Sequence, residues 1–194
     1  MKIVLATRNR KKVEEIRRVM EGKGISFLTL DDFPDCPEVD EDRDSFQGNA
    51  GKKAEAVAHF CGLPALADDS GLVVDALGGA PGVYSARYAG PEATDLSNAE
   101  KVLDGLRGVS GGKRSARFEC VLAFVEPGKD THYYSGRVEG VIAAAPAGEN
   151  GFGYDPVFIP ADGDGQRTFA QMAAHEKDSM SHRGRALASF ADSF

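Results

Sequence analysis

The chain has 194 residues, of which 42% are hydrophobic and 27% charged, and its net charge is −7 at pH 7. This length and composition suit one large globular domain or two closely fused lobes, and they exclude a disordered or fibrous chain. The negative charge argues against nucleic acid as a partner, because a broad nucleic-acid footprint requires many Lys and Arg side chains to neutralise phosphates.

Signals for export or membrane insertion are not found in the sequence. The first apolar run is too short for a signal peptide, and no later stretch approaches the roughly 20 apolar residues that cross a bilayer. Cys36, Cys61 and Cys120 are far apart and form no CxxC pair, which indicates reduced thiols. We therefore expect a cytoplasmic protein with no membrane partner.

Charge is unevenly distributed along the first quarter of the chain. Residues 1–23 hold eight basic side chains against three acidic ones, and residues 31–44 hold eight acidic side chains against one basic. Such runs are usually solvated faces. The alternative interpretation is one site with a phosphate-binding end and a metal-binding end.

The first half of the chain predicts alternating strands and helices. A buried strand over residues 3–6 precedes apolar residues that recur at helical spacing from Val13 to Met20. A second strand over residues 26–30 leads to the acidic loop. Ser45 is the expected N-cap of a helix that reaches Cys61, and residues 65–67 form another short strand.

The second half predicts a hairpin between helical segments. Asp95 caps a helix that reaches Leu106, and two longer strands follow, from Ala116 to Val125 and from Thr131 to Ile142. Val157 to Ile159 forms a further strand, and the last helix runs from Ser181 to Phe194. The sequence thus predicts an α/β fold with a mixed rather than purely parallel sheet.

The junction after the first strand carries Thr7, Asn9 and Lys12. Backbone N–H groups at a helix start, a hydroxyl, an amide and an ammonium can converge there on an anion. The glycines of a Walker A loop are missing. A plain helix cap with solvated basic residues explains the same pattern, so both interpretations stay open.

A second candidate is the segment Asp68-Asp69-Ser70-Gly71, which follows the short strand over residues 65–67. Two adjacent carboxylates at a strand end suit Mg²⁺, which keeps several waters and commonly bridges to substrate phosphates. Glu41 in the acidic loop is the natural partner for the same ion, either directly or through another ligand. An exposed Asx-type turn would use the same residue types.

Further candidates lie on two helices and in a late loop. Lys53 lies beside the apolar stripe of its helix, where a lysine needs a partner or must reach solvent. His182 and Arg183 begin the last helix, where basic side chains oppose the helix dipole unless an anionic or carbonyl-bearing ligand lies nearby. Phe152, in a glycine-containing loop, can stack on a planar base. A surface histidine and an aromatic-anchored turn are the simpler interpretations of each residue taken singly.

Seven segments in chain order carry a resemblance to a known family. They are Thr7 to Lys12, Ser45-Phe46 with Asn49-Ala50, Lys53, Ala67 to Leu72, Gly79 to Tyr88, Gly151 to Pro156, and Lys177 with Ser181-His182-Arg183. Together they resemble the inosine/xanthosine triphosphate pyrophosphatase family. The match runs from residue 3 to about residue 187 without a large insertion.

The resemblance implies a single nucleotide pyrophosphatase domain over residues 1–194. It implies a two-lobed α/β fold around a long mixed sheet, with flanking helices and a cleft between the lobes. It also implies a homodimer that hydrolyses inosine, deoxyinosine and xanthosine triphosphates to the monophosphate and pyrophosphate, with Mg²⁺ as cofactor.

The resemblance also implies a role for each matching residue. Those that grip the triphosphate are Thr7, Arg8, Asn9, Arg10, Lys11 and Lys12. Glu41 and Asp69 hold the metal, and the catalytic set is Asp69, Lys53 and Asp68. The other substrate-binding residues are Ser70, Phe152, Gly153, Tyr154, Asp155, Lys177, His182 and Arg183. Arg8, Arg10 and Lys11 depart from many relatives, which carry small or neutral residues there.

Two other functions, another type of pyrophosphatase and a nucleotide sensor, are alternatives. A Maf-type pyrophosphatase for pyrimidine or modified nucleotides has a similar architecture but lacks the Ser181-His182-Arg183 ending. A non-catalytic nucleotide sensor has no need for the residues that would organise a metal-bound water, namely Asp68, Asp69, Glu41 and Lys53.

A carboxylate that binds a metal loses basicity, so Asp69 is expected to be a metal ligand and water organiser more than a general base.

Overall fold

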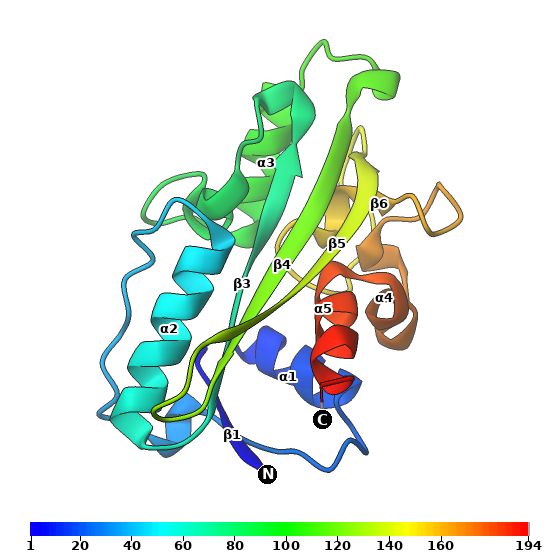
Figure 1. Cartoon of the computed structure of the whole chain (residues 1–194). Helices are drawn as coiled ribbons and strands as arrows, with labels where there is room; N and C mark the ends of the chain where they lie inside the picture. Colours follow the sequence, from blue (N-terminus) through cyan, green and yellow to red (C-terminus); the bar gives the residue numbers. More distant parts are fainter. Residues whose placement is uncertain (194) are drawn as a thin grey trace. The chain divides into compact units, whose positions relative to one another are not determined.

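The computed structural model describes residues 1–193 and contains a six-stranded mixed sheet (Figure 1). The strands are β1 (Lys2–Leu5), β2 (Ser26–Leu28), β3 (Ala65–Val74), β4 (Ser115–Val125), β5 (His132–Ile142) and β6 (Phe158–Pro160), in the order β2-β1-β3-β4-β5-β6. β1 pairs in parallel with β2 and β3, and β5 pairs with β6 in antiparallel orientation. The predicted α/β fold with a mixed sheet is confirmed.

Five α-helices accompany the strands within the described residues. They are α1 (Arg10–Val19), α2 (Phe46–Cys61), α3 (Asp95–Gly105), α4 (Ala174–Met180) and α5 (His182–Ala191). Ser45 caps α2 by accepting a hydrogen bond from the Gly48 N–H at 3.1 Å, and Gly62 ends the helix in the left-handed conformation at φ 64°. Phe194, the expected end of the last helix, lies outside the described residues.

The strand β3 corrects one expectation from the sequence. Asp68 and Asp69 were expected at a strand end, yet β3 runs without a break from Ala65 to Val74. Asp, Ser and Gly are typical of turns, but here buried ion pairs and backbone pairing outweigh that local preference. The two carboxylates therefore lie in the middle of a buried strand.

The chain divides into two compact units, each with its own core. Unit 1 comprises residues 1–69, 120–136 and 183–193, and unit 2 comprises residues 70–119 and 137–182. In unit 1, α2 covers one face of the strands while α1 and α5 cover the opposite face (Figure 1). Neighbouring residues of β1 show this alternation, since Val4 packs on the α2 side and Leu5 on the α1 side.

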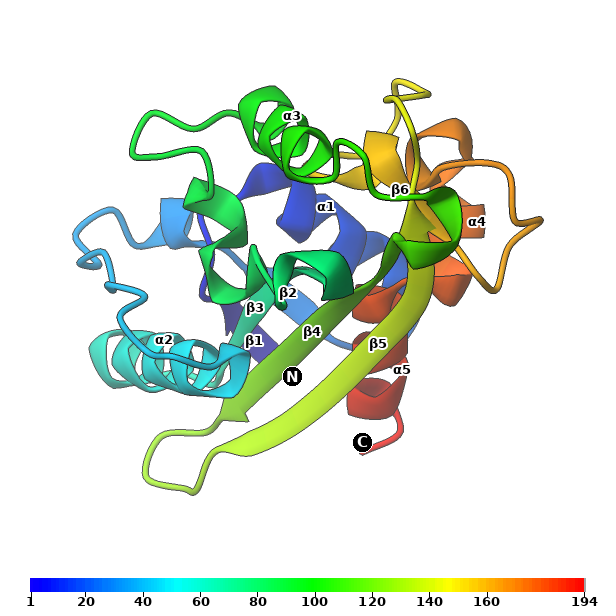
Figure 2. The same cartoon turned by 90° about the horizontal axis from the view of Figure 1, so that it is seen from above.

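The core of unit 2 is built around aromatic side chains. Phe118 of β4 packs edge-on against Phe158 of β6, with ring centroids 4.7 Å apart, and stacks near Phe169 at 6.2 Å. Both views show β4 and β5 side by side and joined by a short turn, the hairpin expected from the sequence (Figure 2).

In residues 1–193, no helix has the length and apolar character needed to cross a membrane.

Candidate active site

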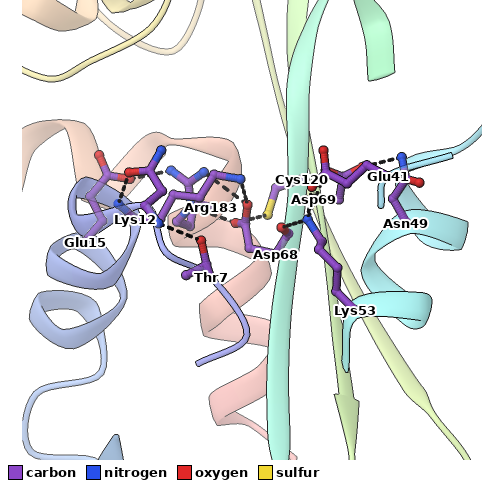
Figure 3. A network of polar contacts seen from close by, with 11 residues as sticks. Thr7, Lys12, Glu15, Glu41, Asn49, Lys53, Asp68, Asp69, Cys120 and Arg183 are labelled. Atoms are coloured by element: carbon purple, nitrogen blue, oxygen red, sulfur yellow. Dashed lines mark hydrogen bonds and ion pairs between the residues drawn. The ribbon is translucent and has the colours of Figure 1, made fainter. Parts of the chain in front are cut away.

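Asp68 and Asp69 are neighbours on β3 but point to opposite sides of the strand. Figure 3 shows Asp68 directed toward α1 and Asp69 directed toward α2. The alternation of side chains along a strand accounts for this geometry. Unit 1 therefore holds two separate polar clusters, one around each carboxylate.

The Asp69 cluster gathers three side chains, two of them from α2. Lys53 donates a hydrogen bond to the carboxylate of Glu41, lies 3.4 Å from Oδ1 of Asp69 and donates to the carbonyl oxygen of Asp68 at 2.9 Å. Asn49, one helical turn earlier, donates from Nδ2 to Oδ2 of Asp69 at 3.2 Å. The carboxylates of Glu41 and Asp69 thus share one ammonium.

The charges of this cluster shift its proton affinities. Burial raises the pKa of Asp69 above its usual value of 3.8; the Lys53 charge opposes this effect, and the Glu41 charge adds to it. Burial alone would lower the pKa of Lys53, but the charges of Asp69 and Glu41 outweigh burial and raise it. Lys53 therefore stays protonated, and its positive charge holds two acids close together.

The donor set of this cluster fits magnesium held jointly with a substrate. Glu41 and Asp69 offer carboxylate oxygens, the ligand type that Mg²⁺ prefers, and a phosphate-bound Mg²⁺ often uses only one or two protein carboxylates. Within residues 1–193, no three His, Cys, Asp or Glu side chains gather closely enough to hold a metal ion by themselves. The set is suited to a metal whose remaining ligands are phosphate and water.

The Asp68 cluster is deeply buried and rich in donors. Lys12 of α1 lies 2.5 Å from Oδ1 of Asp68, and Nε of Arg183 on α5 donates to Oδ2 at 2.8 Å. The Cys120 thiol lies 3.2 Å from the same Oδ2. Burial would raise the pKa of Asp68, but the charges of Arg183 and Lys12 hold it well below its usual value.

Arg183 bridges Asp68 to a second acid, Glu15 of α1. Its guanidinium donates to the Glu15 carboxylate as well, and the side chain is 2% exposed. This geometry favours a structural role in which Arg183 fixes the Asp68 carboxylate and joins α5 to α1. Direct binding of substrate by Arg183 stays a prediction.

The expected triphosphate grip lies at the junction of β1 and α1. The Asn9 side chain caps α1 by accepting from the Lys12 N–H at 3.2 Å, and the Thr7 hydroxyl accepts from the Asn9 N–H at 3.2 Å. Arg8 donates to the carbonyl oxygen of Cys36 at 2.9 Å, so it ties this junction to the acidic loop. Thr7, Arg8 and Arg10 line a surface pocket of about 230 Å³. Lys11 is exposed.

Unit 2 holds the other residues expected to bind substrate, except Arg183. The buried Lys177 donates to Oδ2 of Asp155 at 2.6 Å, and its ammonium lies 5.0 Å from the centre of the Phe152 ring. The Gly153 N–H donates to Oδ2 of Asp95 at 2.9 Å. Lys177 lies inside α4, and it joins that helix to the loop that carries Phe152.

The remaining expected residues of unit 2 are packed against its core. The Tyr154 hydroxyl donates to the carbonyl oxygen of Ser85 at 2.8 Å, and burial raises the pKa of that phenol. The imidazole of His182 stacks on the Phe118 ring, with centroids 4.6 Å apart and planes at 11°. Ser70 directly follows Asp69 on β3 and is half-buried.

Four residues that contact the expected site residues were not themselves expected from the sequence. Asn49 lies one turn from Lys53, and Glu15 lies one turn from Lys12, so helical spacing could have indicated both. Cys120 and Asp95 gave no such signal, because their partners are distant in the chain. Only the folded structure brings the Cys120 thiol to Asp68.

Comparisons with known proteins point to one family. The model of the Ham1 family matches residues 3–193. A dITP/XTP pyrophosphatase from Geobacter sulfurreducens is 49% identical over 191 residues, which is 98% of this chain and 95% of the relative. A protein of the same name from Syntrophobacter fumaroxidans is 52% identical over 185 residues, or 95% of this chain and 78% of the relative.

Solved structures show the same fold. A HAM1 protein from Coxiella burnetii is 42% identical and superposes with a TM-score of 0.89 over 100% of this chain and 98% of the other. The Staphylococcus aureus Ham1 protein is 37% identical, with a TM-score of 0.87 over 99% of this chain and 97% of the other. The resemblance drawn from the seven sequence segments is confirmed.

Proposed function

The chain belongs to the Ham1 family, and we propose that it hydrolyses inosine, deoxyinosine and xanthosine triphosphates to the nucleoside monophosphate and pyrophosphate. Removal of these nucleotides would cleanse the nucleotide pool. The observation that carries the proposal is the pair of carboxylates, Glu41 and Asp69, held around one ammonium on the α2 side of β3. The dITP/XTP pyrophosphatases described above, about half identical to this chain, support the substrate class.

The residues of unit 1 have different roles in the reaction. Magnesium held by Glu41 and Asp69 would supply charge neutralisation at the triphosphate and a polarised water. Asp69 orients the water that attacks the α-phosphorus, and pyrophosphate leaves. The ammoniums of Lys12 and Lys53 offset the negative charge that develops on the leaving group. Asp68 and Glu15 together offset the charges of Lys12 and Arg183 before substrate binds.

We assign recognition of the base to unit 2. Phe152 offers a ring face, and the cationic Lys177 and the imidazole of His182 offer donors. The oxygen at the six-position of hypoxanthine or xanthine accepts hydrogen bonds from these donors. The six-amino group of adenine is itself a donor, so these hydrogen bonds cannot form with adenine. Each unmade bond costs roughly 1–3 kcal/mol.

Product analysis with the purified chain tests the proposal. With Mg²⁺, dITP should give deoxyinosine monophosphate and pyrophosphate in equal amounts, and a chelator should stop the reaction. If the products were orthophosphate and deoxyinosine diphosphate, the bond between the β- and γ-phosphates would have been cleaved. That result would refute the proposal. Faster cleavage of pyrimidine triphosphates would favour a Maf-type activity, and tight binding without turnover would favour a sensor.

We also propose a homodimer and a cytoplasmic location. The family resemblance supports the dimer, and the three free thiols support a reducing compartment. Sedimentation velocity would contradict the dimer if the chain remained a monomer at micromolar concentration. Disulfides in protein isolated from its source would contradict the location.

A further inference from the structure

The Lys53 ammonium lies where a cation bound by Glu41 and Asp69 would lie. Its Nζ contacts three oxygens, which belong to the Glu41 carboxylate, to Oδ1 of Asp69 at 3.4 Å and to the Asp68 carbonyl at 2.9 Å. The lysine side chain is only 12% exposed. This largely buried ammonium is therefore held by protein oxygens.

The Lys53 ammonium contacts the same two carboxylates that a divalent ion would contact. Glu41 and Asp69 together carry two negative charges, and the Lys53 charge offsets one of them. A metal ion entering between the carboxylates meets both a filled position and a like charge in partly buried surroundings, where such charges interact strongly. Mg²⁺ also gives up its water reluctantly.

We propose that Lys53 is the resident cation of the Glu41–Asp69 pair and competes with the divalent ion in the free protein. The metal then binds tightly only together with a triphosphate. The phosphates give the displaced ammonium a new anionic partner and supply the ligands that the protein lacks. This inference rests on the proposed function, because it takes Glu41 and Asp69 as the metal ligands.

The neighbouring lysine provides a matched control. Lys52 lies on the same helix and contacts the same acidic loop, with Nζ 2.8 Å from the Asp40 carbonyl oxygen and 2.8 Å from Oδ1 of Asp42. Replacing Lys52 or Lys53 by methionine changes the net charge equally. Only the Lys53 change removes an ammonium from Glu41 and Asp69.

The test is a titration of the free protein with Mn²⁺, monitored by electron paramagnetic resonance without nucleotide. Lys53→Met and Lys53→Gln should each bind Mn²⁺ at least about tenfold more tightly than the unaltered protein. Lys52→Met should stay within about twofold. Unchanged or weaker binding by both Lys53 variants would overturn the proposal, and so would an equal gain in Lys52→Met.

A second variant locates the ion. Adding Asp69→Asn to Lys53→Met should abolish the gain in Mn²⁺ affinity, and a gain that persists would place the ion elsewhere and refute the proposal. The titration needs no turnover. Failure of the pyrophosphate assay with an intact gain would therefore reject the proposed function while leaving the competition between ammonium and metal in place.

Discussion

Adjacent residues on β3 have opposite electrostatic surroundings. Asp68 lies among Lys12, Arg183 and the Cys120 thiol, and its pKa is held far below the usual value. Asp69 lies beside Glu41 as well as Lys53, and its pKa is raised. At the scale of single residues, Asp68 is a fixed anion, while Asp69 is the carboxylate suited to work with metal and water.

The replacement Asp69→Asn tests this division of roles. It keeps the shape of the side chain and removes the charge, so we expect turnover of dITP to fall by at least about a hundredfold, the scale of loss when a key transition-state group is removed. Circular dichroism should show an unchanged fold. Near-normal pyrophosphate release from this variant would refute the assigned role.

The replacement Asp68→Asn should act mainly on stability. It leaves the buried Arg183, which is 2% exposed, and Lys12 without the carboxylate that they share. Breaking a buried ion pair in this way costs about 3–5 kcal/mol. Urea unfolding measures the loss, and Asp42→Asn, which removes an exposed acid next to Lys52, should leave the midpoint nearly unchanged. Equal midpoints for the two variants would contradict the account.

At the scale of elements, each polar cluster includes a side chain from a helix whose first turn is capped. Asn9 caps α1, which carries Lys12, and Ser45 caps α2, which carries Asn49 and Lys53. In unit 2, the segment before Phe152 is fixed differently. The Asn150 N–H donates to the Ala170 carbonyl at 3.0 Å, so close backbone contact takes the place of a helix.

Gly148 begins that segment and allows us to test its rigidity. Its φ is +87°, and a Cβ there would collide with backbone atoms of Ala170. We expect Gly148→Ala to lower the free energy of unfolding by about 1–3 kcal/mol, from strain and overpacking together. Gly128 has a φ of +78° but no atoms within 4 Å of its Cβ position, so Gly128→Ala should cost less. If both variants lowered the melting temperature equally, the collision with Ala170 would have no measurable effect on stability.

Much of the fold could be predicted from sequence because the apolar pattern dictates it. The alternation in β4 and the spacing in α1 reflect burial, which acts locally along the chain. The strand β3 was harder to predict, since Asp68-Asp69-Ser70-Gly71 has turn composition and its stability in a strand comes from Lys12, Arg183 and Lys53, which are distant in sequence. The candidate site shows the same limit. Residue types indicated Glu41 and Asp69, whereas the contact between the Cys120 thiol and Asp68 appears only in the folded structure.

At the scale of the whole molecule, each unit holds chemistry that suits one part of a nucleotide. Unit 1 gathers the acids and ammoniums suited to a metal and a triphosphate, and unit 2 gathers Phe152, Lys177 and His182, which suit a base. The chain joins these sets directly, because Ser70 follows Asp69 and Arg183 follows His182. These two sets correspond to the two chemical parts of a nucleoside triphosphate with a six-oxo purine.

We propose above all that the protein selects its substrate by the six-position of the base. The most direct test compares kcat/KM for pyrophosphate release from ITP and from ATP at the same Mg²⁺ concentration. The unmade hydrogen bonds with adenine predict a preference for ITP of at least about tenfold, since 1.4 kcal/mol corresponds to a factor of ten. Equal values for the two nucleotides would contradict the account.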